Sequence, residues 1–310
     1  MEMREIEIFR AVMQAGSASK AAALLDISQP AVSQSIRKLE VASGLRLFER
    51  LRGRLVPTPE AAALLVDVDL CFAGFESIKH RMRSLKKFGL RRLSVACFPA
   101  LGTGFMPRAI SAFDLEKRGI EMSFQIMSSR EVYQKVLAGQ VDFGLMADEL
   151  SVNGLERSTF MSLPGVIVLP PNHPLKRKAV IEPSDLVQFP FIALNPEDAS
   201  GGRLSQTMRA MNLQLKPIVE TPYSNSVCEL ALRGVGIGMA HPLIALDYAE
   251  RGLILRPVTM EVNFTALLIF RPGIPLSENA KELLKIMRIQ MAADIVQLQK
   301  MLRSKNKIVS

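Results

Sequence analysis

Residues 11–61 of the chain read AVMQAGSASKAAALLDISQPAVSQSIRKLEVASGLRLFERLRGRLVPTPEA and decide the fold of its N-terminal part. Apolar residues recur at helical spacing, first up to Gly16 and again from Ser28 to Gly44. Glycine ends a helix without strain, and Ser28 followed by Pro30 is the pattern of an N-cap and a first-turn proline. The sequence therefore predicts three helices, over about 3–15, 17–25 and 29–44.

The second and third predicted helices are separated only by a short break at residues 26–27, as in a helix-turn-helix. Apolar residues three and four apart in the third helix can face a core, which leaves the polar residues at its start exposed. The apolar residues are Val32, Ile36 and Leu39, and the polar ones are Gln29, Ser33 and Gln34. Glutamine can form two hydrogen bonds with adenine in the major groove. A solvated helix face without a ligand is the alternative interpretation.

Residues 45–57 continue with apolar residues on both sides of a basic tip. Four arginines stand against one glutamate in this stretch. Arginines spaced by two, such as Arg50, Arg52 and Arg54, point to one side of an extended strand and can contact phosphates or a narrow minor groove. The stretch predicts a two-stranded ribbon of the kind called a wing.

Thr58 and Pro59 can start a fourth helix, and no proline follows until Pro99. We expect this helix to run for about thirty residues, roughly 45 Å, and to end at Gly89. Apolar residues recur at steps of three and four over 64–85, as a helix that pairs with a second copy would require.

From Arg92 onward the pattern alternates short apolar runs with helical stretches, which predicts a mainly parallel α/β sheet with crossover helices. A second lobe begins near residue 164, and the chain returns to the first lobe near residue 268. Ligands in open α/β sheets bind beyond the carboxyl ends of the strands. This rule points to the loops at 99–103, 128–130, 195–202 and 223–226.

The whole chain has 310 residues, 48% hydrophobic content and a formal net charge of +9. This length suits two or more domains, and the positive charge favours an anionic partner such as nucleic acid. The three cysteines match neither a disulfide framework nor a zinc site, which favours a reducing cytoplasm. The N-terminal residues include acids, and no apolar run approaches bilayer length, so we expect neither a secretory signal nor contact with a membrane.

The sequence contains no motif typical of a catalytic, metal or cofactor site. Gly234, Gly236 and Gly238 superficially suggest a dinucleotide loop, but a helical pattern precedes them where that fingerprint requires a strand. The three histidines are dispersed, and no nucleophile stands in a motif with a base. We therefore expect a binding protein without cofactor, not an enzyme.

The quoted N-terminal stretch resembles the winged helix-turn-helix of LysR-type transcriptional regulators. The helix start SQPAVSQ (28–34), the strand GLRLFER (44–50) and the wing exit PT (57–58) occur in the family's order and spacing. VDFGLM (141–146), VLPPNHPL (168–175) and RGVGIGMAHPLIALDY (233–248) resemble markers of the family's effector domain. The amino-acid sequences of 219–238 and 242–253 are most similar to the subgroup of LysR and the opine regulators. That subgroup responds to amino acids or their conjugates.

The resemblance implies an α/β protein in three parts. Residues 1–58 would form the winged helix-turn-helix DNA-binding domain and residues 59–89 the linker and dimerisation helix. Residues 90–310 would form a two-lobed effector domain like a periplasmic binding protein. Its lobe I would comprise about 90–163 and 268–310, and its lobe II about 164–267.

The resemblance also implies partners and a mode of action. Such regulators are cytoplasmic homotetramers, built as dimers of dimers, that bind double-stranded promoter DNA and act as activators or repressors. A small-molecule co-inducer, here of the amino acid class, would modulate that binding, and RNA polymerase is a further candidate partner. An alternative within the same architecture is a redox sensor in which Cys97 and Cys228 form a reversible disulfide.

Site residues follow from matching positions and from the pattern itself. The DNA-binding residues expected are Ser28, Gln29, Pro30, Ser33, Gln34, Arg37, Arg50, Arg52 and Arg54. The effector-binding residues expected are Pro99, Leu101, Gly102, Thr103, Ser128, Ser129, Asn195, Asp198, Ser200, Ser226 and His241. Helix-start amides and the hydroxyls of Ser128 and Ser129 suit a carboxylate, while Glu197 or Asp198 suits an amine. The stretch NPEDASGGRLS (195–205) departs from the family by being acidic and then glycine-rich.

Overall fold

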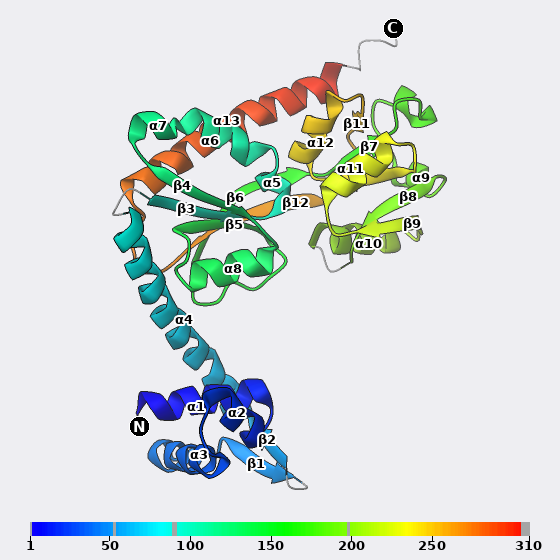
Figure 1. Cartoon of the computed structure of the whole chain (residues 1–310). Coiled ribbons are helices and arrows are strands. Elements are labelled where there is room, and N and C mark those ends of the chain that lie inside the picture. The colour runs from blue at the N-terminus through cyan, green and yellow to red at the C-terminus, as the bar shows by residue number, and fades with distance from the viewer. Residues whose placement is uncertain (1, 52–53, 89–91, 197–198, 305–310) are drawn as a thin grey trace. The chain divides into compact units, whose positions relative to one another are not determined.

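The computed structural model describes residues 2–51, 54–88, 92–196 and 199–304. The chain forms two compact units, Met1–Lys79 and His80–Ser310, and each is described by itself (Figure 1). Within the described ranges, no helix combines the length and the apolar character needed to cross a membrane.

The N-terminal unit starts with three helices, α1 (Met3–Ala15), α2 (Ala18–Leu25) and α3 (Gln29–Ser43). The residues that end α1 and α3, Gly16 and Gly44, have φ angles of 69° and 71°, a conformation that glycine adopts without steric cost. The hydroxyl of Ser17 accepts a hydrogen bond from the Lys20 amide, so Ser17 caps α2 from outside it. The three helices lie where the sequence predicts them, within one residue.

A hairpin of β1 (Phe48–Leu51) and β2 (Arg54–Pro57) follows, with Phe48 opposite Pro57. The carboxylate of Glu40 on α3 accepts hydrogen bonds from the backbone amides of Leu47 (2.8 Å) and Phe48 (3.1 Å). The Thr58 hydroxyl lies 3.1 Å from the Leu47 carbonyl, to which it donates, and accepts from the Ala61 amide. The Glu40 bonds fix the base of the predicted wing against the third helix, and the Thr58 bonds fix it at the start of the helix that follows.

One apolar core joins the helices and the hairpin of this unit. Phe9 of α1 packs edge-on against Phe48 of β1, with ring centroids 5.9 Å apart. The predicted core face of α3 is buried as expected, and Ala21 and Ala22 of α2 let the helices approach closely. The buried residues of α3 are Val32, Ile36 and Leu39.

Helix α4 spans Pro59–Phe88. The predicted pairing stripe divides along it, because its first apolar residues, up to Phe72, pack on the unit's own core. The later ones remain exposed in the single chain, with Phe75 49%, Ile78 58% and Met82 66% accessible. Among the described side chains, the first half of the expected stripe therefore packs on this unit's core, and Phe75, Ile78 and Met82 of the second half are exposed.

The C-terminal unit contains two five-stranded sheets. The first has the order β4 (Glu121–Ile126), β3 (Arg92–Cys97), β5 (Phe143–Ala147), β12 (Asn263–Phe270) and β6 (Glu156–Pro164). The second has the order β11 (Ile254–Arg256), β7 (Val166–Leu169), β10 (Ile237–Ala240), β8 (Pro190–Leu194) and β9 (Lys216–Thr221). In each sheet, three parallel strands meet an antiparallel one. Because β6 and β11 pair antiparallel with β12 and β7, four of the five strands in each sheet run in one direction, as expected for a mainly parallel α/β sheet, and only β12 and β7 are reversed among the described strands.

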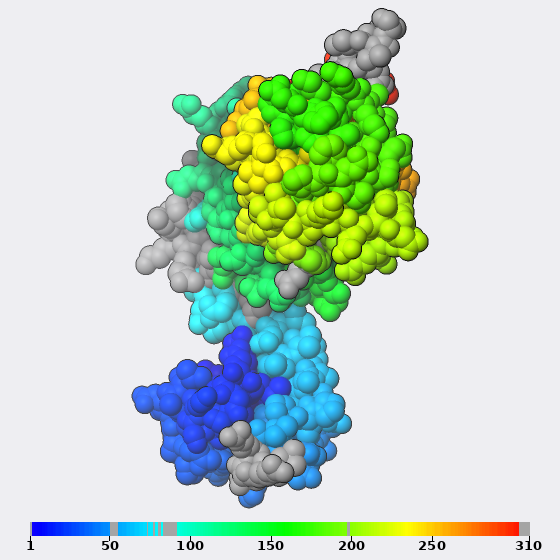
Figure 2. Space-filling view, turned by 90° about the vertical axis from the view of Figure 1, so that its right-hand side faces the viewer, coloured from blue at the N-terminus to red at the C-terminus, as the bar shows by residue number. Residues whose placement is uncertain are grey.

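Each sheet forms a lobe with its own helices. The first lobe carries α5 (Pro99–Gly102), α6 (Phe105–Phe113), α7 (Leu115–Arg118) and α8 (Ser129–Leu137). The second carries the short 3-10 helix η1 (Pro174–Arg177), α9 (Pro183–Leu186), α10 (Ala199–Ala210), α11 (Ser224–Leu232) and α12 (Pro242–Ala249), and its outer face fills much of Figure 2 in green and yellow.

Two segments connect the lobes: the return of the chain into β12, and the long helix α13. The chain returns to the first sheet at Asn263, not near residue 268, because all of β12 pairs with β5 and β6. The long helix α13 (Glu278–Ser304) packs Leu283 and Met287 in the first core and Leu298 in the second. One rigid helix thus contributes to both lobes (Figure 1).

Candidate nucleic-acid interface and effector cavity

The start of α3 presents polar side chains on an exposed surface of the N-terminal unit. The Ser28 hydroxyl accepts a hydrogen bond from the Ala31 amide, and Pro30 occupies the first turn, so the helix begins where the sequence places it. The side-chain amide of Gln29 donates to the Ser33 hydroxyl at 2.9 Å. This bond orients two predicted contact residues, one turn apart, on the same helix face.

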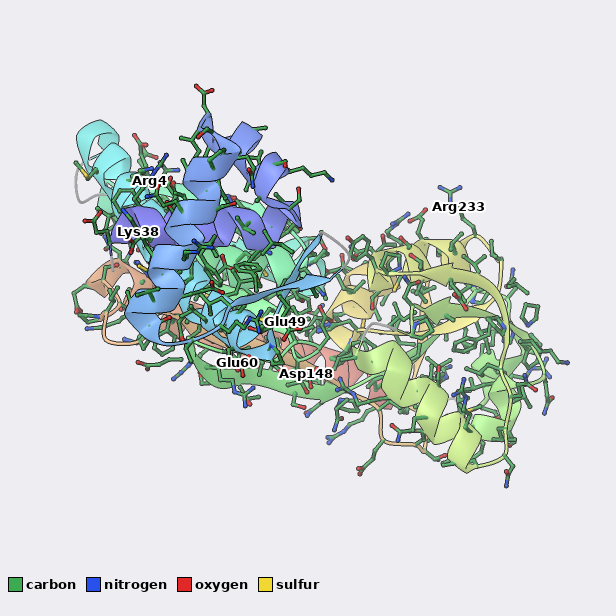
Figure 3. All side chains as sticks on the ribbon, turned by 90° about the horizontal axis from the view of Figure 1, so that it is seen from below. Arg4, Lys38, Glu49, Glu60, Asp148 and Arg233 are labelled. Atoms are coloured by element: carbon green, nitrogen blue, oxygen red, sulfur yellow. The ribbon has the colours of Figure 1, made fainter. Side chains whose placement is uncertain are left out.

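Basic side chains continue this surface along α3. Arg37 and Lys38 are exposed, and Figure 3 labels Lys38 together with Arg4 of α1. A hollow of about 540 Å³ lies between α3 and the hairpin. It is lined by Ala18, Pro30, Ser33, Gln34, Ile36, Arg37, Glu40, Arg46, Phe48 and Leu55. Arg46 belongs to the basic stretch 45–57, but it was not among the predicted DNA-binding residues.

The predicted wing arginines are only partly placed. Arg50 lies in β1 opposite Leu55, and Arg54 lies in β2 opposite Leu51. Arg52 and the side chains of Arg50 and Arg54 lie outside the described residues, so their role remains a prediction.

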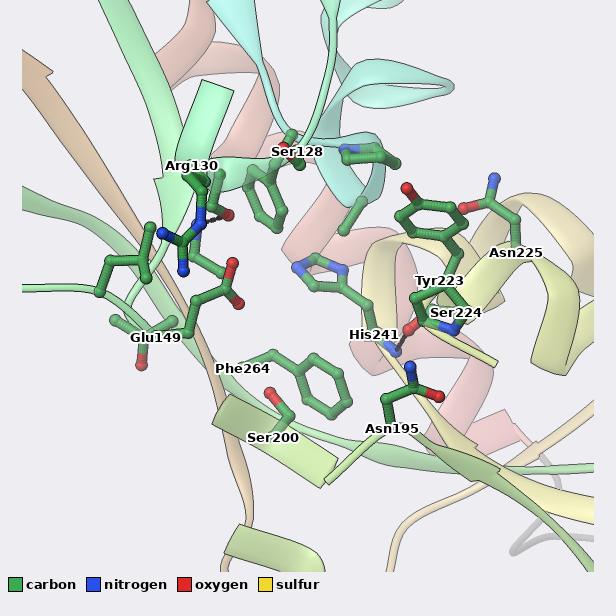
Figure 4. Close-up of a pocket in the computed structure, with 18 residues that line it drawn as sticks. Ser128, Arg130, Glu149, Asn195, Ser200, Tyr223, Ser224, Asn225, His241 and Phe264 are labelled. Atoms are coloured by element: carbon green, nitrogen blue, oxygen red, sulfur yellow. Dashed lines mark hydrogen bonds between the residues drawn. The ribbon is translucent and has the colours of Figure 1, made fainter. Parts of the chain in front are cut away.

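A cavity of about 360 Å³ lies in the C-terminal unit, with walls from both lobes (Figure 4). The first lobe supplies Phe98, Pro99, Ala100, Ser128, Ser129, Arg130, Ala147, Glu149, Leu150, Phe264 and Thr265. The second lobe supplies Asn195, Ser200, Pro222, Tyr223, Ser224, Asn225 and His241. Its position beyond strand ends agrees with the rule for open α/β sheets.

Six of the predicted effector residues line this cavity, and four others among the described residues do not. The six are Pro99, Ser128, Ser129, Asn195, Ser200 and His241. Leu101 and Gly102 are buried in the first lobe, where a Cβ on Gly102 would lie 2.9 Å from Cγ1 of Ile126. Thr103 accepts a hydrogen bond from Asn225, and Ser226 lies on α11 outside the lining. Glu197 and Asp198 lie outside the described residues.

Ser128 does not offer a free anion site at the start of α8. Its hydroxyl donates to the Glu131 carboxylate at 2.6 Å, and its backbone amide donates to the same oxygen. The bond from the Ser128 hydroxyl, and after it the bond from the Ser128 amide, lowers the pKa of the Glu131 carboxyl below its usual value. Glu131 thus engages the hydroxyl and the amide of Ser128 that were expected to meet a ligand carboxylate, while the role of Ser129 and of the other helix-start amides towards a ligand remains a prediction. Ser129 accepts a hydrogen bond from the Ala147 amide at 3.1 Å.

Charged lining residues at two first-lobe positions were not among the predicted effector residues. Arg130 follows Ser129 on α8, and Glu149 follows β5. Both lie on one side of the cavity in Figure 4. Glu149 lies in the loop after β5, which was not among the predicted ligand-binding loops although it follows the end of a strand. Phe264 was missed because β12 lies 116 residues after the end of β5 in sequence.

Two of the described sets of polar contacts between the lobes involve residues of the cavity lining or their chain neighbours. Arg203 of α10 donates to both oxygens of Asp148, after β5, at 3.0 and 3.2 Å, and also to the carbonyl of Asn263 (Figure 3 labels Asp148). The Asn225 amide donates to Thr103 at 3.0 Å. The lobes are therefore joined by hydrogen bonds as well as by chain crossings.

The two interior cysteines do not face one another. Cys97 is buried in the first lobe's core and Cys228 in the second. Burial raises the pKa of both thiols, which lowers the fraction of reactive thiolate. The redox alternative is therefore not favoured. No group of His, Cys, Asp and Glu among the described residues could hold a metal ion.

His241 is the most deeply buried titratable group of the lining, with 1% of its surface accessible. Burial lowers the pKa of its imidazole from 6.5 to about 3. Between these values the folded protein binds fewer protons than the unfolded chain, so the free energy of unfolding decreases as the pH falls.

We expect the stability of the wild type to fall relative to that of His241→Asn below about pH 6.5, by up to about 1.4 kcal/mol per pH unit. Urea unfolding of both proteins at about pH 7 and about pH 5 measures this difference. An equal loss in both proteins would show that His241 is not held neutral.

Both units match the family models of known proteins. Residues 3–62 match the family model of bacterial regulatory helix-turn-helix proteins of the lysR family, and residues 89–292 match that of the LysR substrate binding domain. Transcriptional activator protein LysR of Escherichia coli K12 is 38% identical over 269 residues, which cover 87% of this chain and 86% of that protein. OccR of Rhizobium meliloti, the octopine catabolism/uptake operon regulatory protein, is 30% identical over 85% of this chain and 87% of its own length.

Solved structures share the fold at lower identity. An OxyR C206 mutant of Corynebacterium glutamicum superposes with a TM-score of 0.56 at 18% identity, covering 96% of this chain and 95% of that one. CbnR complexed with its target DNA gives a TM-score of 0.53 at 20% identity, covering 94% of this chain and 99% of that one.

Proposed function

Because the chain belongs to the LysR family of bacterial transcriptional regulators, we propose that α3 and the wing bind its promoter and that the inter-lobe cavity binds an amino acid or amino-acid derivative. The family consists of DNA-binding transcription regulators, not enzymes. The proposed target is promoter DNA, which in a bacterial cell lies in the cytoplasm, and we propose that location for this protein.

The DNA-binding part of the proposal rests on the composition of the α3 surface. Gln29 and Ser33 supply hydrogen bonds for base edges, and Arg37 and Lys38 supply positive charge for phosphates. The hairpin that follows α3 carries the wing arginines. We propose that these arginines contact the phosphate backbone of the DNA beside the bases that α3 reads.

The observation that carries the effector proposal is the mixed charge of the cavity. The guanidinium of Arg130 suits a carboxylate, and the negative charge of Glu149 suits an ammonium group. Amide side chains at Asn195 and Asn225 add hydrogen bonds of both kinds. An α-amino acid or an opine presents both charges, and one relative, OccR, is named for octopine.

Thermal unfolding of the full chain with glycine, L-lysine, L-glutamate and octopine tests this proposal. A ligand at a hundred times its Kd should stabilise the protein by about 2.7 kcal/mol. We expect Arg130→Met to lose most of this stabilisation, because the ligand carboxylate loses its cation.

Arg157→Met is the matched control, since Arg157 is an exposed arginine of β6 in the same lobe, outside the cavity lining. Equal stabilisation of the wild type and Arg130→Met would remove Arg130 from the site. No stabilisation of the wild type by any of the four compounds would contradict an amino-acid effector.

We further propose that α4 pairs two chains through its exposed apolar residues, as part of a dimer of dimers. Exposed phenyl and aliphatic side chains at Phe75, Ile78 and Met82 are the surface that such pairing would bury. Ile78→Glu should shift the sedimentation of the protein towards smaller species, because it places a charge in the interface. Unchanged sedimentation would place the pairing elsewhere.

A further inference from the structure

His241 presents one defined ring nitrogen to the effector cavity. It follows β10 and caps α12, where its Nδ1 accepts a hydrogen bond from the Leu243 amide at 3.3 Å. A ring nitrogen that accepts carries no proton, so the proton of the neutral imidazole lies on Nε2. The backbone amide of His241 donates to Ser224 at 3.0 Å, which fixes the residue further.

Nε2 has no hydrogen-bond partner among the described residues. The imidazole projects into the middle of the lining residues in Figure 4. Two first-lobe rings flank it edge-on, with centroids 6.3 Å away for Phe98 and 5.4 Å away for Phe264. A buried N–H donor without an acceptor is costly, and such groups in folded proteins usually have a partner. An acceptor brought by a ligand would supply that partner.

A second unpartnered atom lines the same cavity. Asn225 uses its Nδ2 to bind Thr103, and its Oδ1 is buried without a donor. The other unpartnered buried atoms of the described side chains are the Nε atoms of Arg108 and Arg203, whose guanidinium groups already form ion pairs. Of the four, one donor and one acceptor therefore belong to residues that line the cavity, and both residues are in the second lobe.

We infer that His241 is a specificity-determining residue, whose Nε2–H selects effectors with an oxygen acceptor, while Asn225 Oδ1 receives a donor of the same molecule. This inference rests on the proposed effector function. An oxygen that reaches Nε2 passes the edges of Phe98 and Phe264, so the bound molecule contacts both lobes there. Hydrocarbons and simple amines, which lack an oxygen acceptor, are excluded as effectors.

Two substitutions separate this role from the helix cap. In His241→Asn, the side-chain oxygen replaces Nδ1 as the acceptor for Leu243, and the donor in the cavity is lost. In His241→Gln, the longer side chain places an N–H near the position of Nε2, and the cap is lost. A structural role predicts that asparagine is the better substitute, whereas a ligand role predicts that glutamine is.

Isothermal titration calorimetry of the full-length proteins with glycine, L-lysine, L-glutamate and octopine tests the inference. For each compound that binds the wild type, we expect Kd to rise about tenfold or more in His241→Asn, and clearly less in His241→Gln. Wild-type affinity in a folded His241→Asn protein would overturn the inference and leave the proposed function intact. Failure of all four compounds to bind the wild type would overturn both.

Nitrogen NMR of the wild-type imidazoles provides a measurement that does not depend on the folding of any variant. The chain has three histidines, so the His241 signal can be assigned. We expect an Nε2–H tautomer whose signal shifts when a binding compound is added. An Nδ1–H tautomer, or a signal that a bound compound does not move, would overturn the inference.

Discussion

Replacing Arg108 with methionine is expected to lower the free energy of unfolding of the C-terminal unit by about 3–5 kcal/mol. Arg108 of α6 donates to Asp247 of α12 at 2.6 Å and to Asp294 of α13 at 2.7 Å. Only 3% of the Asp294 side chain is accessible, so the variant would leave a buried carboxylate with the Gln290 amide as its remaining described partner. Urea unfolding monitored by circular dichroism measures the loss.

The control for this prediction is Lys281→Met on the same helix, α13. Lys281 pairs with Glu278 at the surface, where both side chains are more than half accessible, and such pairs contribute at most about 1 kcal/mol. A loss for Arg108→Met as small as that for Lys281→Met would mean that the buried cluster adds little to stability.

The Arg108 cluster also has a role in arranging the lobes, because it joins α6 of the first lobe to α12 of the second. Burial raises the pKa of Asp247 in spite of Arg108, so this carboxylate depends on its partner. A Cβ on Gly104 would overlap Oδ2 of Asp247, which explains why glycine stands at the start of α6. We expect Gly104→Ala to weaken the same junction without removing a charge.

The second large effect is expected at the recognition surface. Gln29→Ala should weaken binding to the specific promoter site by about 1–3 kcal/mol and leave binding to random duplex nearly unchanged. The reason is that the Gln29 side chain, oriented by Ser33, is proposed to read a base edge and not a phosphate. Fluorescence anisotropy with labelled duplexes at one fixed salt concentration measures both affinities.

Gln14→Ala provides the control, since Gln14 is an exposed glutamine on α1 of the same unit. It should leave both affinities unchanged. An equal loss on specific and random DNA in Gln29→Ala would assign Gln29 to backbone contacts, and no loss on either would place it outside the interface.

The N-terminal unit could be predicted closely because its signals are local. Ser17, Ser28, Gly16 and Gly44 each specify a helix end through a bond or a backbone angle within a few residues. The apolar positions of α3 follow helical spacing, and so its buried face could also be predicted. The side chains of the wing arginines lie outside the described residues, so their role remains a prediction.

The effector cavity could be predicted only in part, because it is assembled from distant segments. Strand ends pointed to Ser129, Asn195 and the start of α11. Phe264 lines the cavity because β12 pairs with β5, and no local sequence pattern predicts that pairing. Ser128 was assigned to a ligand although a serine followed three residues later by glutamate is the pattern of a capping box, in which Glu131 accepts from both the hydroxyl and the amide of Ser128.

Anisotropy titration of the purified full-length protein against the intergenic DNA beside its own gene and against random duplex of equal length decides whether it is a sequence-specific regulator. We expect the intergenic fragment, or another fragment of its genome, to bind about a thousandfold more tightly than random duplex. Equal affinity for every genomic fragment and for random duplex would contradict the assignment of α3 and the wing as a promoter-reading module.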